Sequence, residues 1–146
     1  MKTDKIVLVT GGFDPIHQGH IEYIKAAMSY GDRLIVGLNS DEWLSRKKGK
    51  PFMAWKDRYS IVENLKQVNE VISFDDSDGS ANNAIRMIRE KYPDSRIIFA
   101  NGGDRVSSNI PEMDVGDKNI SFIFGVGGDV KLNSSSRIIN LWENGD

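Results

Sequence analysis

This chain of 146 residues contains no cysteine, and neither sign of charge dominates it. Without cysteine there is no disulfide framework, no thiolate nucleophile and no thiolate metal site. The formal net charge of −2 gives no general attraction to nucleic acid or to an anionic membrane. No apolar run could span a bilayer, and the first, residues 6–10, is too short for a signal peptide. We therefore expect a soluble, cytoplasmic protein that binds neither nucleic acid nor membrane.

The chain does contain a regular alternation of short apolar runs and segments with helical periodicity, and its length fits one domain over residues 1–146. The apolar runs predict strands at residues 6–10, 34–38, 71–74, 96–100 and 120–124. Helices are predicted at residues 21–28, 42–46, 54–68, 81–92 and 134–142. Residues 105–119 are polar, and either a loop over the site or a short helix fits them. This alternation predicts an α/β fold with a doubly wound, five-stranded parallel sheet, Rossmann-like in the order 3-2-1-4-5, with helices on both faces.

Residues 11–20 read G-G-F-D-P-I-H-Q-G-H and join the first predicted strand to the first helix. Gly11 and Gly12 let a ligand approach the backbone closely. The open N–H groups and positive dipole of the helix start favour an anion there, most plausibly a phosphate. His17 and His20 stand at the same helix start. Their spacing alone favours helix capping or metal binding over catalysis.

The pattern G-x-F-D-x-x-H-x-G-H resembles the signature of the nucleotidylyltransferase superfamily, in particular its cytidylyltransferase-like branch. Glycerol-3-phosphate cytidylyltransferase and heptose-1-phosphate adenylyltransferase belong to that branch, and D-P-I-H also resembles the nicotinate-mononucleotide adenylyltransferases. The resemblance implies transfer of CMP or AMP from CTP or ATP to a small phosphorylated polyol or sugar, with release of pyrophosphate. We lean slightly to CTP. It also implies a homodimer and Mg²⁺ that arrives with the triphosphate, and we expect no metal site made by the protein.

In such a reaction the acceptor phosphate is already ionised, so the enzyme has to stabilise negative charge on the α-phosphate and the leaving group. His17 and His20 suit this task, because imidazole donates to phosphate oxygens and can gain charge near neutral pH. The resemblance makes these histidines catalytic. It assigns nucleotide binding to the turn itself, which comprises Gly11, Gly12, Phe13 and Asp14. From the residues alone, Asp14 either holds the turn before Pro15 or meets the magnesium ion.

A basic segment follows the second strand and includes Arg46, Lys47, Lys48 and Lys50. A charge run of this kind is usually a solvated surface. Together with the residues around it, however, the segment resembles the N-S-D…K-G…R-P…R pattern of the heptose-1-phosphate adenylyltransferases. The resemblance places Lys48 on a mobile loop as the catalytic contact to the triphosphate, with Lys47 as the second candidate for nucleotide binding. It assigns substrate binding to Asn39, Asp41 and Arg58.

Two polar turns complete the candidate site. The first is similar to the G-G-D turn that lies near the base and ribose in the same relatives, and it comprises Asn101, Gly102, Gly103 and Asp104. There Asp104 either accepts from ribose hydroxyls or closes the turn. The second matches the serine-rich signature that opens the last helix, where hydroxyls bind phosphate or simply cap the helix. It comprises Ser134, Ser135 and Ser136. The predicted strand order brings the first turn beside Gly11 and Gly12.

Residues 129–133 depart from the family pattern, because they lack the arginine that glycerol-phosphate enzymes carry before the serines. Lys131 is the nearby positive charge. The departure puts glycerol-3-phosphate as the acceptor in doubt. It leaves two alternatives open, an ATP-dependent adenylyltransferase of the heptose-1-phosphate or mononucleotide type and a nucleotide-binding module without turnover.

Overall fold

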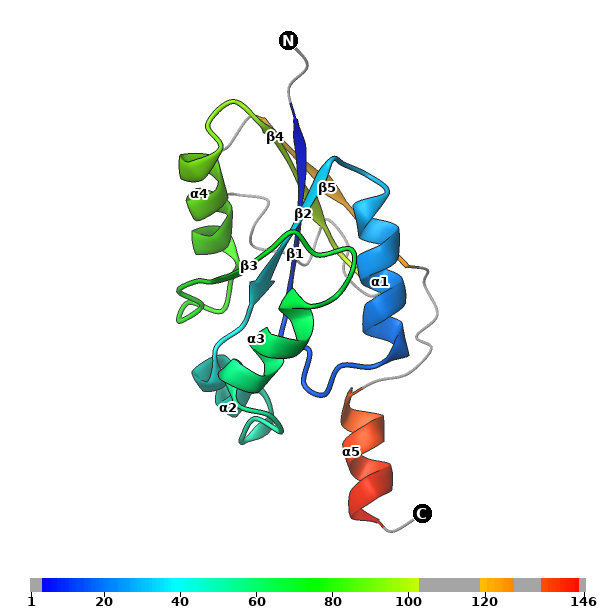
Figure 1. Cartoon of the computed structure of the whole chain (residues 1–146). Coiled ribbons are helices and arrows are strands. Elements are labelled where there is room, and N and C mark those ends of the chain that lie inside the picture. The colour runs from blue at the N-terminus through cyan, green and yellow to red at the C-terminus, as the bar shows by residue number, and fades with distance from the viewer. Residues whose placement is uncertain (1–3, 103–118, 128–134, 145–146) are drawn as a thin grey trace.

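The computed structural model describes residues 4–102, 119–127 and 135–144 (Figure 1). Its strands are β1 (Lys5–Gly11), β2 (Arg33–Leu38), β3 (Glu70–Ser73), β4 (Arg96–Ala100) and β5 (Ile120–Ile123). They form one parallel five-stranded sheet in the order β3-β2-β1-β4-β5. The predicted strands and their order are therefore confirmed.

The helices are α1 (Gln18–Met28), α2 (Asp41–Lys48), α3 (Trp55–Glu63), α4 (Asn82–Lys91) and α5 (Ser135–Glu143). Two of them differ from the sequence expectation. Residues 46–48, expected in a loop, form the last turn of α2, which ends at Gly49 with a positive φ of 96°. Helix α3 stops five residues before the predicted end, although Leu65 and Val68 still pack against the core through two tight turns.

Both faces of the sheet are buried, as expected where crossover helices cover a parallel sheet. Val7 and Val9 of β1 face a cluster that includes Ile24 of α1 and Val62 of α3. The intervening residues of β1 face a second cluster, which is built largely on α4. Figure 1 shows α1 and α4 on opposite sides of the sheet. The doubly wound arrangement is thus confirmed, and it follows from alternate burial along β1.

The carboxyl ends of the strands lie at the lower end of Figure 1, where α2 and α5 also lie. From β1 the sheet continues through β2 and β3 on one side and through β4 and β5 on the other, so the direction of the strand order reverses between β1 and β4. In open α/β sheets, ligands bind in the crevice at such a switch point. No helix within the described ranges is both long enough and apolar enough to cross a membrane.

Candidate active site

The turn between β1 and α1 packs closely against α2. A Cβ atom added at Gly12 would lie 2.7 Å from Cδ2 of Leu44, a buried side chain of α2. Phe13 has a positive φ of 51° and places its ring in the core, 3% exposed and edge-on to the ring of His20. The aromatic ring of Phe13 therefore packs in the core and supports the turn.

His17 and His20 cap α1 and fix each other. His17 is the N-cap residue, and its Nδ1 accepts from the backbone N–H of Gly19 at 3.0 Å. His20 Nδ1 accepts from the backbone N–H of His17 at 3.2 Å, and the two ring centroids lie 4.0 Å apart. A neutral imidazole that accepts at Nδ1 carries its proton at Nε2. The capping arrangement therefore holds two Nε2–H donors side by side.

Both imidazoles favour the neutral form. Burial, together with the charges of His17 and Lys47, lowers the pKa of His20 to about 3. Burial also lowers the pKa of His17. The expectation that both rings gain charge near neutral pH is wrong for His20, because a buried ring is costly to protonate. As neutral donors the rings are already in a single protonation state when an anion arrives.

The backbone donors at the start of α1 are used inside the protein. The N–H of Gly19 donates to the His17 ring, and those of His20 and Ile21 donate to the His17 carbonyl at 3.0 and 3.2 Å. These three N–H groups are not open to a ligand, contrary to the sequence expectation. The imidazole Nε2–H groups are then the candidate anion donors at this helix start.

Asp14 is buried and lies between the turn and the segment after α2. Its carboxylate accepts from the backbone N–H groups of Phe52 at 2.6 Å and Met53 at 2.7 Å. The ammonium group of Lys48 lies 2.9 Å from Oδ2 of Asp14 and donates to the Asp14 carbonyl at 2.5 Å. These contacts hold the turn, which is one of the two roles expected of Asp14.

The described residues do not fit a resident magnesium ion. Oδ2 of Asp14 accepts from the backbone N–H of Phe52 and pairs with Lys48, and Oδ1 accepts from the N–H of Met53, so the carboxylate is engaged with three donors inside the protein. In the described part of the chain, no group of three or more His, Asp or Glu side chains is placed to hold a metal. Magnesium that accompanies a nucleoside triphosphate is commonly held by phosphate oxygens and by water.

Arg58 is fully buried and joins three segments of the site. Its guanidinium donates to the carbonyls of Gly12 at 3.0 Å and Asn39 at 2.7 Å, and its Nε donates to the carbonyl of Met53. Its Nη2 lies 2.6 Å from Oδ1 of Asp41, the first residue of α2. These contacts place Asn39, Asp41 and Arg58 together around the glycine turn. Because the Arg58 side chain is 0% exposed, it acts on the turn from inside the protein.

Asp76 is a site residue that sequence reasoning missed. It lies in the acidic loop after β3, is buried, and accepts from the Asn39 amide and from both the N–H and hydroxyl of Ser40. Ser40 in turn caps α2. The neighbouring acids Asp75 and Asp78 are exposed. Nothing in the local sequence distinguishes Asp76 from them, since the tertiary contact with β2 is what selects it.

The two candidate lysines sit at the end of α2 and point to different partners. Lys48 contacts Asp14, whereas the Nζ of Lys47 lies 4.7 Å from the centroid of the Trp43 ring. The Lys47 charge also helps to lower the pKa of His20, so it acts on the histidine pair. Both lysines belong to a helix that is fixed at both ends. The predicted mobile loop is therefore replaced by the last turn of α2.

Helix α5 and the end of β4 complete the surroundings. The Ser135 hydroxyl donates to the carbonyl of Pro15 at 2.8 Å, which ties the start of α5 to the turn. Asn101, at the end of β4, is buried, and its amide donates to the carbonyls of Phe99 and Ile123. Gly102 follows it, and a Cβ atom added at Gly102 would lie 3.8 Å from the Tyr23 ring of α1. The remaining sequence candidates lie outside the described residues. They are Gly103, Asp104, Ser134, the Ser136 side chain and nearly all of residues 105–119.

The fold and the histidine-capped turn at the switch point define a Rossmann-like nucleotide-binding protein. The model of the cytidylyltransferase-like family matches residues 8–139. The chain therefore belongs to the cytidylyltransferase-like family.

Two relatives are similar to the chain in sequence, and one solved structure shares its fold. The chain is 39% identical over 119 residues to the bifunctional protein HldE of Blochmanniella floridana, covering 80% of this chain and 22% of the relative. It is 34% identical over 131 residues to the bifunctional protein HldE of Actinobacillus succinogenes, covering 88% and 24%. The chain thus spans about a quarter of the length of these relatives. A lipopolysaccharide core biosynthesis protein from Thermoplasma volcanium shares the fold, with a TM-score of 0.65, 21% identity and coverage of 89% and 99%.

Proposed function

We propose that this chain transfers CMP or AMP from CTP or ATP to a small phosphorylated polyol or sugar and releases pyrophosphate. One observation carries the proposal. Two neutral Nε2–H donors lie side by side at the switch point, on a turn that also contacts a lysine-bearing helix. This set of groups suits the charge that builds up when a phosphate ester oxygen attacks another phosphate.

The proposed reaction needs no nucleophile from the protein. An oxygen of the acceptor phosphate attacks the α-phosphorus, a new P–O bond forms, and the bond to the β-phosphate oxygen breaks to release pyrophosphate. His17 and His20 donate to the phosphate oxygens, and the cationic ends of Lys47 and Lys48 offset negative charge. Positioning and electrostatics then supply the rate enhancement.

The finer features of the proposal rest on resemblance. The N-S-D…K-G pattern between β2 and α3 favours a heptose-type adenylyltransferase, and the overall length suits a cytidylyltransferase equally. We propose that magnesium arrives bound to the triphosphate, and that the protein acts as a homodimer. An ATP-dependent enzyme of the mononucleotide type is the second candidate, favoured by D-P-I-H.

A pyrophosphate-release assay tests the proposal. The chain is incubated with CTP or ATP, each with magnesium, over a panel of sugar phosphates, polyol phosphates and mononucleotides. We expect turnover with one nucleotide and one class of phosphorylated acceptor, and that nucleotide should raise the melting temperature by linkage. Nucleotide binding without turnover on any acceptor would indicate a binding module instead.

A further inference from the structure

The ammonium group of Lys48 has a fixed place in the site. It lies 2.9 Å from the Asp14 carboxylate and 2.5 Å from the Asp14 carbonyl, and both acceptors belong to the turn that leads into His17. The Asp14 side chain is only 1% exposed, whereas the Lys48 side chain is 24% exposed. The carboxylate is therefore buried, and the lysine side chain that pairs with it is partly exposed.

Asp14 is itself held rigidly. Its two carboxylate oxygens accept from the consecutive backbone N–H groups of Phe52 and Met53. The carbonyl of Met53 accepts in turn from the buried Arg58. A buried carboxylate with several donors is fixed in position. The Asp14 carboxylate, which pairs with Lys48, is therefore held in place relative to the turn.

The count of donors determines what Lys48 can still do. An ammonium group has three N–H donors and no acceptor. Asp14 accepts from this group with its carboxylate and with its carbonyl, which leaves one N–H. A lysine without such contacts has four rotatable side-chain bonds, and it loses entropy when it is ordered on a ligand.

We propose that Asp14 is a positioning residue, which holds two N–H groups of Lys48 so that the third donates to the phosphate chain of the bound nucleotide. The inference rests on the proposed function. It adds Asp14 as a residue that affects catalysis through Lys48. It also gives a reason for the burial of an acid beside a site that binds polyanions. The carboxylate accepts from three donors, which offset part of its negative charge.

A double-mutant cycle separates positioning from simple support of the fold. We would measure kcat and KM for Lys48→Met, Asp14→Asn and the double variant. Lys48→Met should lower kcat on the order of a hundredfold, as for loss of one charge-stabilising donor. Asp14→Asn should lower kcat at least about tenfold with KM changed by less than about threefold, because misplacement of a catalytic group costs rate. The double variant should match Lys48→Met within about threefold.

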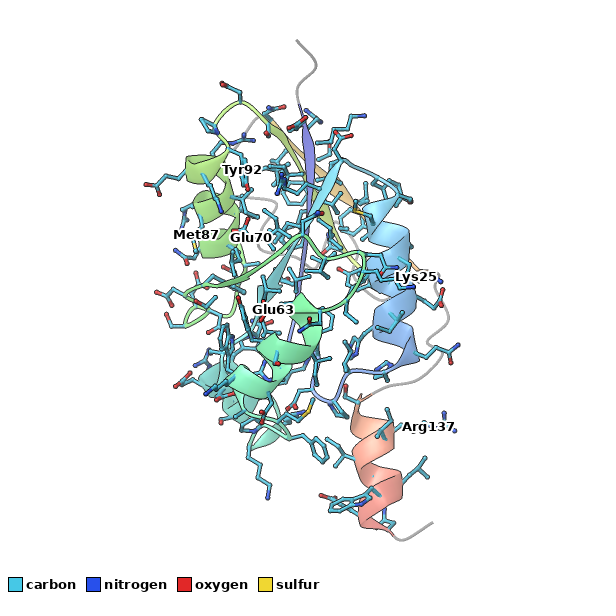
Figure 2. The ribbon with its side chains drawn as sticks, in the orientation of Figure 1. Lys25, Glu63, Glu70, Met87, Tyr92 and Arg137 are labelled. Carbon is cyan, nitrogen blue, oxygen red and sulfur yellow. The ribbon has the colours of Figure 1, made fainter. Side chains whose placement is uncertain are left out.

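Glu70→Gln is the matched control. Glu70 forms an ion pair of 2.8 Å with Lys91, similar in length to that of Asp14 and Lys48. It lies beside α4, near Tyr92 and away from α5 (Figure 2). Its loss should leave kcat and KM unchanged. Melting temperatures of all variants show whether each one is folded.

The outcomes distinguish this inference from the proposed function. If the wild type turns over and the two single effects multiply in the double variant, Asp14 does not act through Lys48 and the inference is overturned. The inference is also overturned if Lys48→Arg, which keeps the positive charge, is no more active than Lys48→Met. If Asp14→Asn does not fold, the coupling is sought between Asp14→Glu and Lys48→Met, with the same criterion. A wild type that binds neither CTP nor ATP in calorimetry overturns the proposed function and this inference with it.

Discussion

Replacing Arg58 by Met removes a guanidinium that joins the glycine turn, the end of β2 and the segment before α3. The side chain is fully buried and donates to the carbonyls of Gly12, Asn39 and Met53. Methionine fills a similar volume without donating, so these carbonyls lose their partner. The carboxylate of Asp41, in contrast, is 39% exposed and can be solvated after the loss.

The cost can be worked out from these contacts. Each carbonyl left unpaired costs about 1–2 kcal/mol, so three carbonyls give about 3–6 kcal/mol. This agrees with the cost of about 3–5 kcal/mol for breaking a buried ion pair. For a chain of this length, such a loss lowers the melting temperature by about 10 °C. The loss is a large part of the roughly 5–15 kcal/mol that stabilises a domain.

Urea unfolding and thermal unfolding, both followed by circular dichroism, measure this loss. Arg46→Met is the matched control, since Arg46 is exposed and donates to the carbonyl of Asp76 alone. It should cost no more than about 1 kcal/mol. A loss below about 1 kcal/mol for Arg58→Met would refute the reasoning that the buried guanidinium holds the turn together.

Three further predictions concern His17, His20 and Gly127, a glycine after β5 that lies close to α1. Asn replacing His17 keeps an N-cap acceptor but loses the Nε2–H donor, so we expect a melting temperature near that of the wild type and a kcat reduced on the order of a hundredfold; near-full activity would contradict the donor role. Burial lowers the pKa of His20 to about 3, below its ordinary 6.5, so the unfolded chain takes up this proton first and stability should fall as pH drops from 6.5 towards 3. Urea unfolding should show this loss, about 1–2 kcal/mol at pH 5, and the loss should be smaller in His20→Asn, where only His17 has a lowered imidazole pKa. Ala replacing Gly127, at a φ of 85° and with its Cβ 3.0 Å from the Cα of Tyr23, should cost about 1–3 kcal/mol. Ala replacing Gly79, at a φ of 82° with open space around it, should cost less by chemical denaturation, and equal losses would exclude the close approach as the cause.

Sequence periodicity was sufficient for the strands and a parallel sheet, because the alternation of short apolar runs with helical faces is a local property. The order 3-2-1-4-5 was an expectation for a doubly wound sheet, and it depends on pairing between distant segments. Val7 and Val9 face one layer and Ile6 and Leu8 the other, and that burial on both sides produces a continuous apolar run. The histidine motif was also visible, since His17 and His20 are neighbours in the chain. Helix ends were less well predicted. Lys48 closes α2, where a basic loop was expected.

The protonation of the histidines could not be read from their spacing. It depends on how deeply the His20 ring is buried and on the charges of His17 and Lys47, which act through space. The roles of the charged residues were equally hidden. The resemblance singled out Arg58 without showing that it is fully buried, and nothing in the local sequence separates Asp76 from the exposed Asp75.

By itself, then, the sequence determined the doubly wound sheet, the turn that leads into α1 and the presence of two imidazoles there, because these depend on hydrophobic period and on residues close in the chain. Only the tertiary structure decided which charges are buried and what they hold. Asp14 meets Lys48 across 34 positions, and Arg58 meets Gly12 across 46. The physical reason is that the free energy of a charge depends on its solvation and partners, and both are set by the packing of distant segments.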